Sequence, residues 1–121
     1  MVALDEERND AGYVLGRMFA VLEHLQETAN PGINSTIKNR YFNSACSTPG
    51  IIFPLLLKLS NSHLRKISGN KGMAINFERD ITALFAKIKE IPKRLDLREQ
   101  GEFMLGYYHQ VQYRYTKKED K

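Results

Sequence analysis

The side chains that most often carry catalysis or hold metals are sparse in this chain of 121 residues. Its histidines, His24, His63 and His109, lie far apart, and none has a histidine or cysteine partner at metal-ligand spacing. The single cysteine, Cys46, lacks the sequence signature of a nucleophile and cannot form a disulfide within the chain. The segment "SGNKG" at residues 68–72 lacks the spacing of a phosphate-binding Walker loop. We therefore expect no enzymatic activity, no metal site and no cofactor.

The basic residues offer the clearest chemistry in this chain, and they are unevenly distributed. Residues 1–30 hold two basic and six acidic residues, whereas residues 31–98 hold twelve basic and four acidic ones, net +8. Lysine and arginine neutralise phosphates whatever the base sequence, and asparagine donates hydrogen bonds to phosphate oxygens. The nucleic-acid contacts expected on this basis are Asn34, Lys38, Arg40, Lys58, Arg65, Lys66, Lys71, Lys87, Lys89, Lys93 and Arg94.

Residues 31–50, "PGINSTIKNRYFNSACSTPG", combine asparagines, hydroxyl side chains and two cations with no acidic residue. A short helix is expected from about residue 34 to residue 43, and its start near Asn34–Thr36 would offer backbone amides to an anion. The same pattern also fits a capped short helix whose outer face is merely solvated. The residues alone leave both interpretations open.

Five aromatic residues, Phe103, Tyr107, Tyr108, Tyr113 and Tyr115, occur close together near the C-terminal end. Stacking on nucleic-acid bases is one use for such a cluster. Core packing with the hydroxyl groups at the rim is the interpretation we favour, because amphipathic aromatics usually lie that way. Tyr113 lies away from the main apolar stripe and is the candidate for contact with a partner.

The elements that must position these residues are expected to be helices. The fold class predicted is all-α, a compact and largely antiparallel bundle of four to five helices in one domain, residues 1–121, with frayed ends at 1–9 and 116–121. Besides the short helix, the periodic segments are residues 10–30, 48–68, 75–90 and 96–115.

Three of these segments carry specific expectations. In the first, Gly12, Gly16 and Ala20 are four residues apart and form a smooth strip, which we expect to dock a neighbouring protein. The run 51–57 is apolar nearly all round, so its helix should be central, with a kink or a start at Pro54. The last segment should bury the face formed by Leu97, Gly101, Met104, Tyr108, Val111 and Tyr115.

No window is long and apolar enough for a membrane-spanning helix, and the acidic start "MVALDEERND" lacks the apolar core of a secretory signal. Together with the single cysteine, this predicts a cytoplasmic protein without a membrane partner.

The segment "ANPGINSTIKNRYFNSACSTPGIIFPLLLKLSNSHLRKI", preceded by "YVLGRMFAVLEHLQE" and followed by "EQGEFMLGYYHQVQ", carries a resemblance from about Tyr13 to Asp120. It resembles the C-terminal helical region of the large subunit of type I-C CRISPR surveillance complexes (Cascade), most specifically in "RYFNSACSTP" and "GYYHQ". A chain that begins with Met1 just before this region resembles the separately translated small subunit of that complex.

The resemblance implies a non-catalytic helical bundle that lines the inner belly of the complex. It implies contacts with neighbouring small subunits, with the backbone and large subunits, and with the phosphates of unwound target DNA; guide RNA is a further nucleic-acid partner it leaves open. The alternative is a purely structural assembly module, in which the Gly12–Gly16–Ala20 strip and the tyrosines dock proteins and the cations stay solvated.

Overall fold

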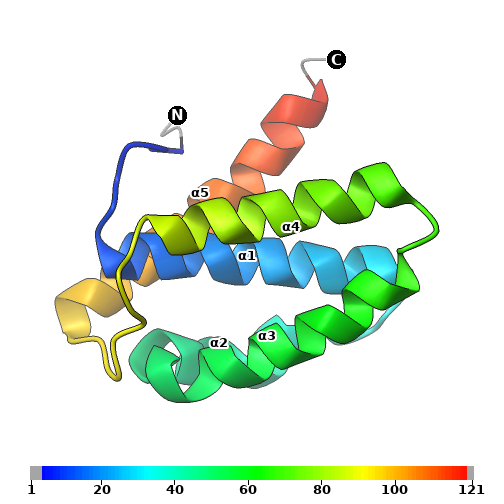
Figure 1. Cartoon of the computed structure of the whole chain (residues 1–121). Coiled ribbons are helices and arrows are strands. Elements are labelled where there is room, and N and C mark those ends of the chain that lie inside the picture. The colour runs from blue at the N-terminus through cyan, green and yellow to red at the C-terminus, as the bar shows by residue number, and fades with distance from the viewer. Residues whose placement is uncertain (1–3, 120–121) are drawn as a thin grey trace.

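The structure, a computed structural model, describes residues 4–119. These residues form an all-α bundle, as predicted, and its helices are α1 (Ala11–Ala29), α2 (Ile37–Ser47), α3 (Pro49–Lys66), α4 (Lys71–Ala86) and α5 (Leu97–Glu119) (Figure 1). The backbone of α5 is helical beyond Tyr115, where the sequence suggested a frayed tail. Residues 1–3 and 120–121, also expected to fray, lie outside the described residues.

Helix α1 is the centre of the bundle, and it packs against each of the other four helices. Every residue from Gly12 to Glu23 is buried. Helix α4 runs back along α1, whereas α5 runs in the same direction as α1 (Figure 1). The α1–α5 contact is the most extensive in the bundle. The two most closely packed helices are therefore separated in the sequence by the other three helices.

The prediction that residues 51–57 form the central helix is wrong. Helix α3 lies to one side of α1 and buries only its Phe53 side, while Ile51 is 59% exposed and Leu55 is also exposed. Pro49 occupies the first turn as expected, and the helix continues on both sides of the exposed Pro54 rather than starting there. An apolar run that is exposed on one side leaves hydrophobic surface for contacts outside the bundle.

The buried face of α5 also differs from the prediction. The observed core side carries Phe103, Gly106, Tyr107 and His109, whereas Tyr108 is 53% exposed. Most of the expected stripe therefore faces solvent, namely Leu97, Gly101, Met104, Tyr108 and Tyr115, and only Val111 is half-buried against the core. The start of α5 is as predicted: the Glu99 amide donates to Asp96 Oδ1 at 2.8 Å, and the Asp96 amide donates to Glu99 Oε1 at 2.9 Å.

The segment before α1 is held against the bundle by polar contacts. Arg8 forms an ion pair with Asp10, 2.8 Å between Nη2 and Oδ2, and a second one with Glu102 of α5. The Asp5 amide donates to the Tyr13 hydroxyl at 2.9 Å. Within residues 4–119, no helix combines the length and the apolar composition that crossing a bilayer requires.

Candidate nucleic-acid interface

Helices α2 and α3 form one layer of the molecule, which lies below α1 in Figure 1. We call residues 37–47 and 49–66 the α2–α3 layer. Neither helix contains an aspartate or glutamate, and the sequence has no acidic residue between Glu27 and Glu78. The basic side chains of the layer are therefore not offset by carboxylates of the same helices, and the two helices carry a net positive charge.

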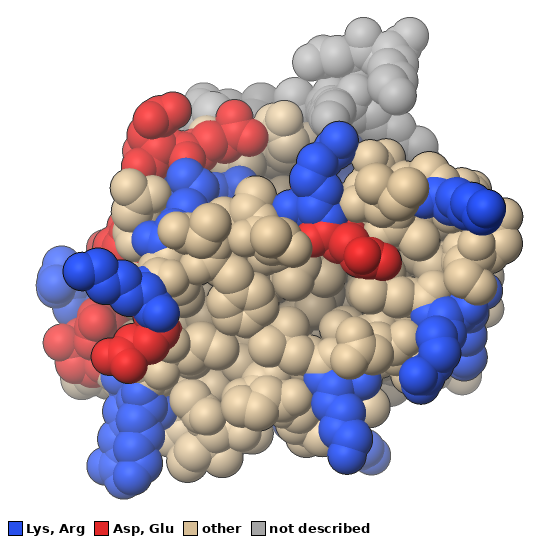
Figure 2. Space-filling model, viewed as in Figure 1, with Lys and Arg blue, Asp and Glu red and all other residues tan. Residues whose placement is uncertain are grey.

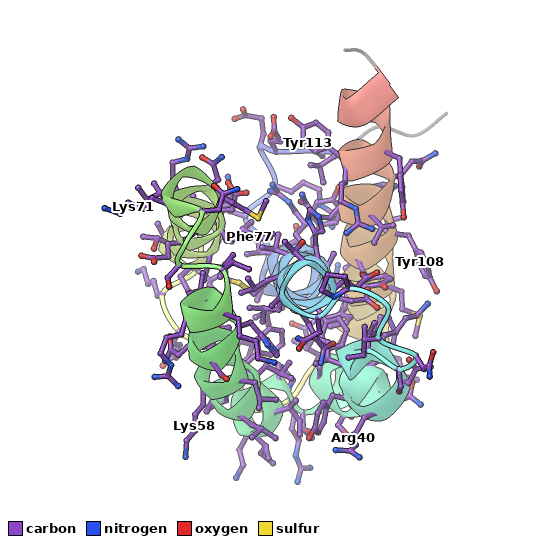
Figure 3. All side chains as sticks on the ribbon, turned by 90° about the vertical axis from the view of Figure 1, so that its right-hand side faces the viewer. Arg40, Lys58, Lys71, Phe77, Tyr108 and Tyr113 are labelled. Atoms are coloured by element: carbon purple, nitrogen blue, oxygen red, sulfur yellow. The ribbon has the colours of Figure 1, made fainter. Side chains whose placement is uncertain are left out.

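The layer presents its cations to solvent on several sides. Arg40 of α2 and Lys58 of α3 are exposed, and both point away from the body of the molecule toward the same side (Figure 3). Arg65 is exposed further along α3, and Lys66 Nζ donates to Asn30 Oδ1 at 2.6 Å. Among the described residues, the ion pairs involve Arg8 alone, so these cations remain available to an anionic partner.

The connection between α4 and α5 adds two cations beside the junction of α2 and α3. The Leu95 amide donates to the Ser47 carbonyl oxygen at 3.0 Å. The backbone of Lys93 lies so close to Gly50 that an added Cβ would be 2.8 Å from Lys93 Cα. Lys93 and Arg94, both exposed, therefore extend the basic surface of the α2–α3 layer.

The remaining predicted contacts are not part of this surface. Lys71, at the start of α4, lies at the opposite end of the view in Figure 3 from Arg40. Lys87 is half-buried, and its Nζ donates to the Glu6 carbonyl oxygen at 2.7 Å, so it holds the N-terminal segment. Lys89 is exposed in the turn that follows α4. The predicted residues are thus divided between those on or beside the α2–α3 layer and those at separate positions.

The anion site expected at the start of α2 is already filled by the protein, which corrects that prediction. The Ile37 amide donates to Gln26 Oε1 at 2.7 Å, and the Lys38 amide donates to Thr36 Oγ1 at 3.2 Å. A helix start whose amides have these partners has no vacant donors for a phosphate. Asn34 lies exposed in the preceding loop, where its side chain stays a candidate contact without the support of those amides.

The strip of Gly12, Gly16 and Ala20 does accommodate another backbone, but that backbone is α5 of the same chain. A Cβ added to Gly12 would lie 2.6 Å from the Glu99 carbonyl oxygen, and one added to Gly16 would overlap the Phe103 carbonyl oxygen. Ala20 is 3% exposed. The prediction that this strip docks a neighbouring protein is therefore corrected, because the strip is used inside the fold.

Tyr113 is placed differently and stays a candidate for contact with a partner. It is 36% exposed and lines a small hollow of about 150 Å³ between α1, α4 and α5. Phe77 of α4 lines the same hollow, and Figure 3 shows the two side chains on the side where α4 and α5 diverge.

Lys38 lies among aromatic rings, an arrangement that no local pattern in the sequence indicates. Its Nζ donates to the Tyr108 hydroxyl at 3.2 Å and lies 5.1, 5.3 and 5.8 Å from the ring centroids of Tyr108, Tyr107 and Phe42. These distances allow cation–π attraction. Lys38 and Tyr108 are separated by 70 residues, so only the packing of α2 against α5 brings them together.

A buried polar network holds one of the aromatic rings around Lys38 in place. Tyr107 donates a short hydrogen bond to Glu23 Oε1, and Glu23 Oε2 accepts from Thr36 Oγ1 at 2.6 Å. Burial and the hydrogen bond to the Glu23 carboxylate raise the pKa of Tyr107 far above its ordinary value. The network ties α1, the start of α2 and α5 together at one point.

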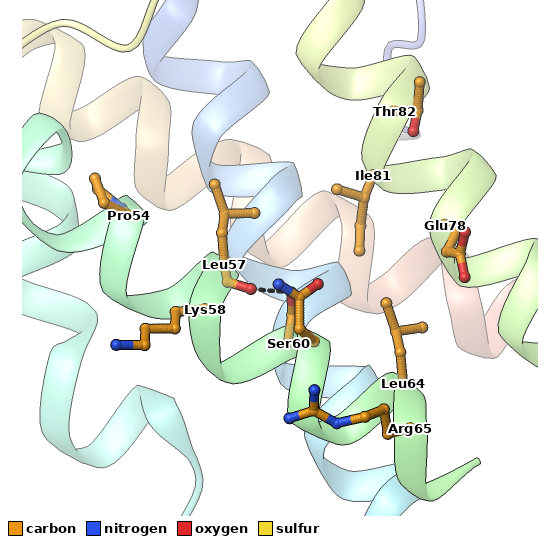
Figure 4. Close-up of a pocket in the computed structure, with 10 residues that line it drawn as sticks. Pro54, Leu57, Lys58, Ser60, Leu64, Arg65, Glu78, Ile81 and Thr82 are labelled. Carbon is orange, nitrogen blue, oxygen red and sulfur yellow. Dashed lines mark hydrogen bonds between the residues drawn. The ribbon is translucent and has the colours of Figure 1, made fainter. Parts of the chain in front are cut away.

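A groove of about 750 Å³ separates α3 from α4 (Figure 4). Leu57, Leu64 and Ile81 give it an apolar lining, and Lys58 and Glu78 place charges of both signs along it. In Figure 2 the basic side chains on this side of the molecule stand at the edges around a largely uncharged centre.

The residues examined for catalytic chemistry have structural surroundings. His109 Nδ1 lies 2.8 Å from the Tyr13 hydroxyl, and burial together with Lys66 lowers the pKa of the half-buried His63. Burial raises the pKa of Cys46, which disfavours the reactive thiolate. In the part of the chain that the structure describes, no three His, Cys, Asp or Glu side chains are grouped to hold a metal ion.

Comparison with known proteins identifies the family. Residues 1–115 match the family model Cas_Csd1, described as a CRISPR-associated protein. The chain belongs to the Csd1 family. This Csd1-family chain is therefore a component of a Cascade-type CRISPR system, with other subunits of the complex as its partners. Comparison with curated proteins gives no significant match.

Proposed function

We propose that this Csd1-family chain is the non-catalytic small subunit of a type I-C surveillance complex, and that it stabilises unwound target DNA through contacts with phosphates. The observation that carries the proposal is the α2–α3 layer, two packed helices that expose cations and contain no carboxylate. The resemblance of the sequence to the small subunit and the family match support the same role.

The chemistry of the layer suits a partner recognised by charge. Arg40, Lys58, Lys93 and Arg94 are exposed on flexible side chains and would neutralise phosphates without reading bases. In RNA-guided complexes, pairing between guide and target reads the sequence, and the protein supplies charge and shape. A rigid helical layer that lines the path of the DNA meets this requirement.

The first test is the salt dependence of DNA binding by the full-length chain. Affinity for a fluorescently labelled single-stranded oligonucleotide should fall linearly with salt concentration on logarithmic axes, with a slope of about −0.7 for each phosphate neutralised. Arg40→Glu should weaken binding and reduce the magnitude of that slope by about 0.7, the value for one lost phosphate contact. Titrations between roughly 50 and 200 mM salt measure both quantities.

Arg79→Glu is the matched control, because Arg79 is also an exposed helical arginine but lies on α4, outside the α2–α3 layer. Its replacement makes the same change in net charge and should leave the slope close to that of the wild type. Equal losses in the two variants would mean that net charge, rather than this layer, governs binding.

The second candidate function is a purely structural assembly module. The groove between α3 and α4 favours it, because an apolar lining beside the exposed Ile75 suits a contact with another protein. This role predicts that reversing charges on the α2–α3 layer leaves DNA handling by the assembled complex unchanged.

A further inference from the structure

The exposed side of α5 carries two tyrosines at a regular spacing. Tyr108 is 53% exposed and Tyr115 is 55% exposed. They are seven residues apart, which places them on one side of the helix with their Cα atoms separated by about 10 Å. Met104, 44% exposed, lies one turn before Tyr108 on the same side. Large aromatic surfaces that a small protein leaves in solvent usually serve recognition.

Each of these tyrosines has a cation beside its ring. Lys38 Nζ donates to the Tyr108 hydroxyl at 3.2 Å and lies 5.1 Å from the ring centroid. Arg114 Nη2 donates to the Tyr115 hydroxyl at 3.2 Å, and its Cζ lies 4.9 Å from that ring centroid. Neither cation forms an ion pair with a described carboxylate, and the sequence of α5 has no acidic residue between Glu102 and Glu119.

We propose that this side of α5 is a stacking site for single-stranded nucleic acid, in which bases lie on the rings of Tyr108 and Tyr115 and the adjoining phosphates contact Lys38 and Arg114. The inference rests on the proposed function and extends it from phosphate contact to contact with unpaired bases. Proteins that hold single strands without sequence preference combine these two features, a cationic track and aromatic platforms.

The structure holds the Tyr108 ring in place before any ligand arrives. The ring packs edge-to-face on Tyr107, with centroids 5.0 Å apart, and Tyr107 is itself fixed by its hydrogen bond to the buried Glu23. Lys38 restrains the hydroxyl end of the ring. A platform that is already ordered loses little conformational freedom on binding, so more of the stacking energy appears as affinity.

The chemistry favours an unpaired strand over the other polyanions that a basic surface attracts. Stacking requires an open base face, and the bases of a duplex are already covered by their neighbours. A protein partner would use the apolar area of Met104 and the rings but would need carboxylates to neutralise Lys38 and Arg114. A single strand supplies the flat apolar faces and the regular negative charges together.

Tyr108→Ala is the direct test, with Tyr108→Phe as the control that keeps the ring. In fluorescence anisotropy titrations with a labelled oligothymidine, Tyr108→Ala should bind roughly 5- to 150-fold more weakly than the wild type, the loss of one stacked base. The slope of affinity against salt should be unchanged, because no phosphate contact is removed. Tyr108→Phe should bind with nearly the affinity of the wild type.

A tryptophan probe gives an independent readout, because the chain contains no tryptophan. The emission of Tyr108→Trp should be quenched when oligothymidine is added and should change little with a blunt duplex of equal length. Ile75→Trp, at a position 59% exposed on α4, is the matched probe that should not respond.

The outcomes separate this inference from the proposed function. If Tyr108→Ala binds oligothymidine as the wild type does and binding stays salt-dependent, stacking is wrong and phosphate contact stands. If no variant or wild type shows salt-dependent binding, the proposed function itself fails. If Tyr108→Ala keeps its affinity for the oligonucleotide but no longer enters the complex, this side of α5 docks a protein and the inference is overturned.

Discussion

Gly16→Ala is expected to destabilise the fold by about 3 kcal/mol, at the upper end of the usual cost of overpacking. The added Cβ would overlap the Phe103 carbonyl oxygen and lie 2.9 Å from the Tyr107 amide nitrogen, and both are backbone atoms of α5 that cannot turn aside. The α1–α5 contact that must widen is the most extensive in the bundle. Urea unfolding followed by circular dichroism measures the loss.

Gly101→Ala is the matched control on the partner helix. No atom lies within 4 Å of a Cβ added there, so the substitution should raise the free energy of unfolding by about 0.5–1 kcal/mol through helix propensity alone. If Gly16→Ala proved as stable as Gly101→Ala, the close α1–α5 crossing would be wrong. Filling the strip at Gly16 therefore reports on folding and not on the docking of a neighbouring subunit.

Tyr107→Phe is expected to lower the free energy of unfolding by about 2 kcal/mol. The substitution removes a hydrogen bond to the carboxylate of Glu23, which is 9% exposed and keeps only its bond from Thr36. Hydrogen bonds to charged groups contribute about 1.5–3 kcal/mol. Tyr108→Phe should change stability by less than about 0.5 kcal/mol, because the hydroxyl it removes is exposed. Equal effects in the two variants would mean that the buried network does not stabilise the fold.

The raised pKa of Tyr107 leads us to expect a loss of stability at alkaline pH. The pKa of Tyr107 is raised in the fold by burial and by Glu23, whereas an unfolded tyrosine titrates near about 10. Ionisation therefore favours the unfolded chain, so the stabilisation is present below pH ~10 and declines as the pH rises above that value. The decline should be shallower in Tyr107→Phe, and an unchanged pH profile would contradict the raised pKa.

Local signals in the sequence predicted several helix ends, although α4 spans Lys71–Ala86 rather than the expected residues 75–90. The Asn30-Pro31-Gly32 stop, the Pro49 first turn and the Asp96–Glu99 capping box all lie at helix ends in the structure. These signals act over one turn of chain, so they need no knowledge of the packing. The short helix expected at residues 34–43 exists, but it begins at Ile37, because Thr36 rather than an earlier residue caps it.

The packing of the helices was harder to predict, for physical reasons. A helix with apolar residues on several sides does not show which side is buried, and α3 exposes Ile51 although its sequence reads as a core helix. In α5 the stripe through Tyr108 and the stripe through Tyr107 both fit a helical period. Gly106 decides between them, because it packs against the backbone of Tyr13, a residue 93 positions earlier in the sequence.

In the candidate site, too, local features were predictable from the sequence and features that depend on helix packing were not. The charge of residues 31–98 predicted a basic surface, and Arg40 and Lys58 are exposed on one side of the molecule (Figure 3). The involvement of Lys93 and Arg94 depends on the connection that crosses the α2–α3 junction, and the Lys38–Tyr108 pair depends on how α2 packs on α5. Contacts between residues so far apart in the sequence leave no local signal in a single sequence.

The central claim, that the α2–α3 layer holds unwound DNA in the assembled complex, is tested most directly by DNA loading. A complex reconstituted with the double variant Arg40→Glu and Lys58→Glu should assemble normally and open target duplex less well than the wild-type complex, with a deficit that is largest at low salt and shrinks as salt rises. The fraction of target held open, measured by permanganate footprinting, is the readout, and a complex with Arg79→Glu is the control. Normal opening at every salt concentration by a complex that contains the double variant would contradict the account.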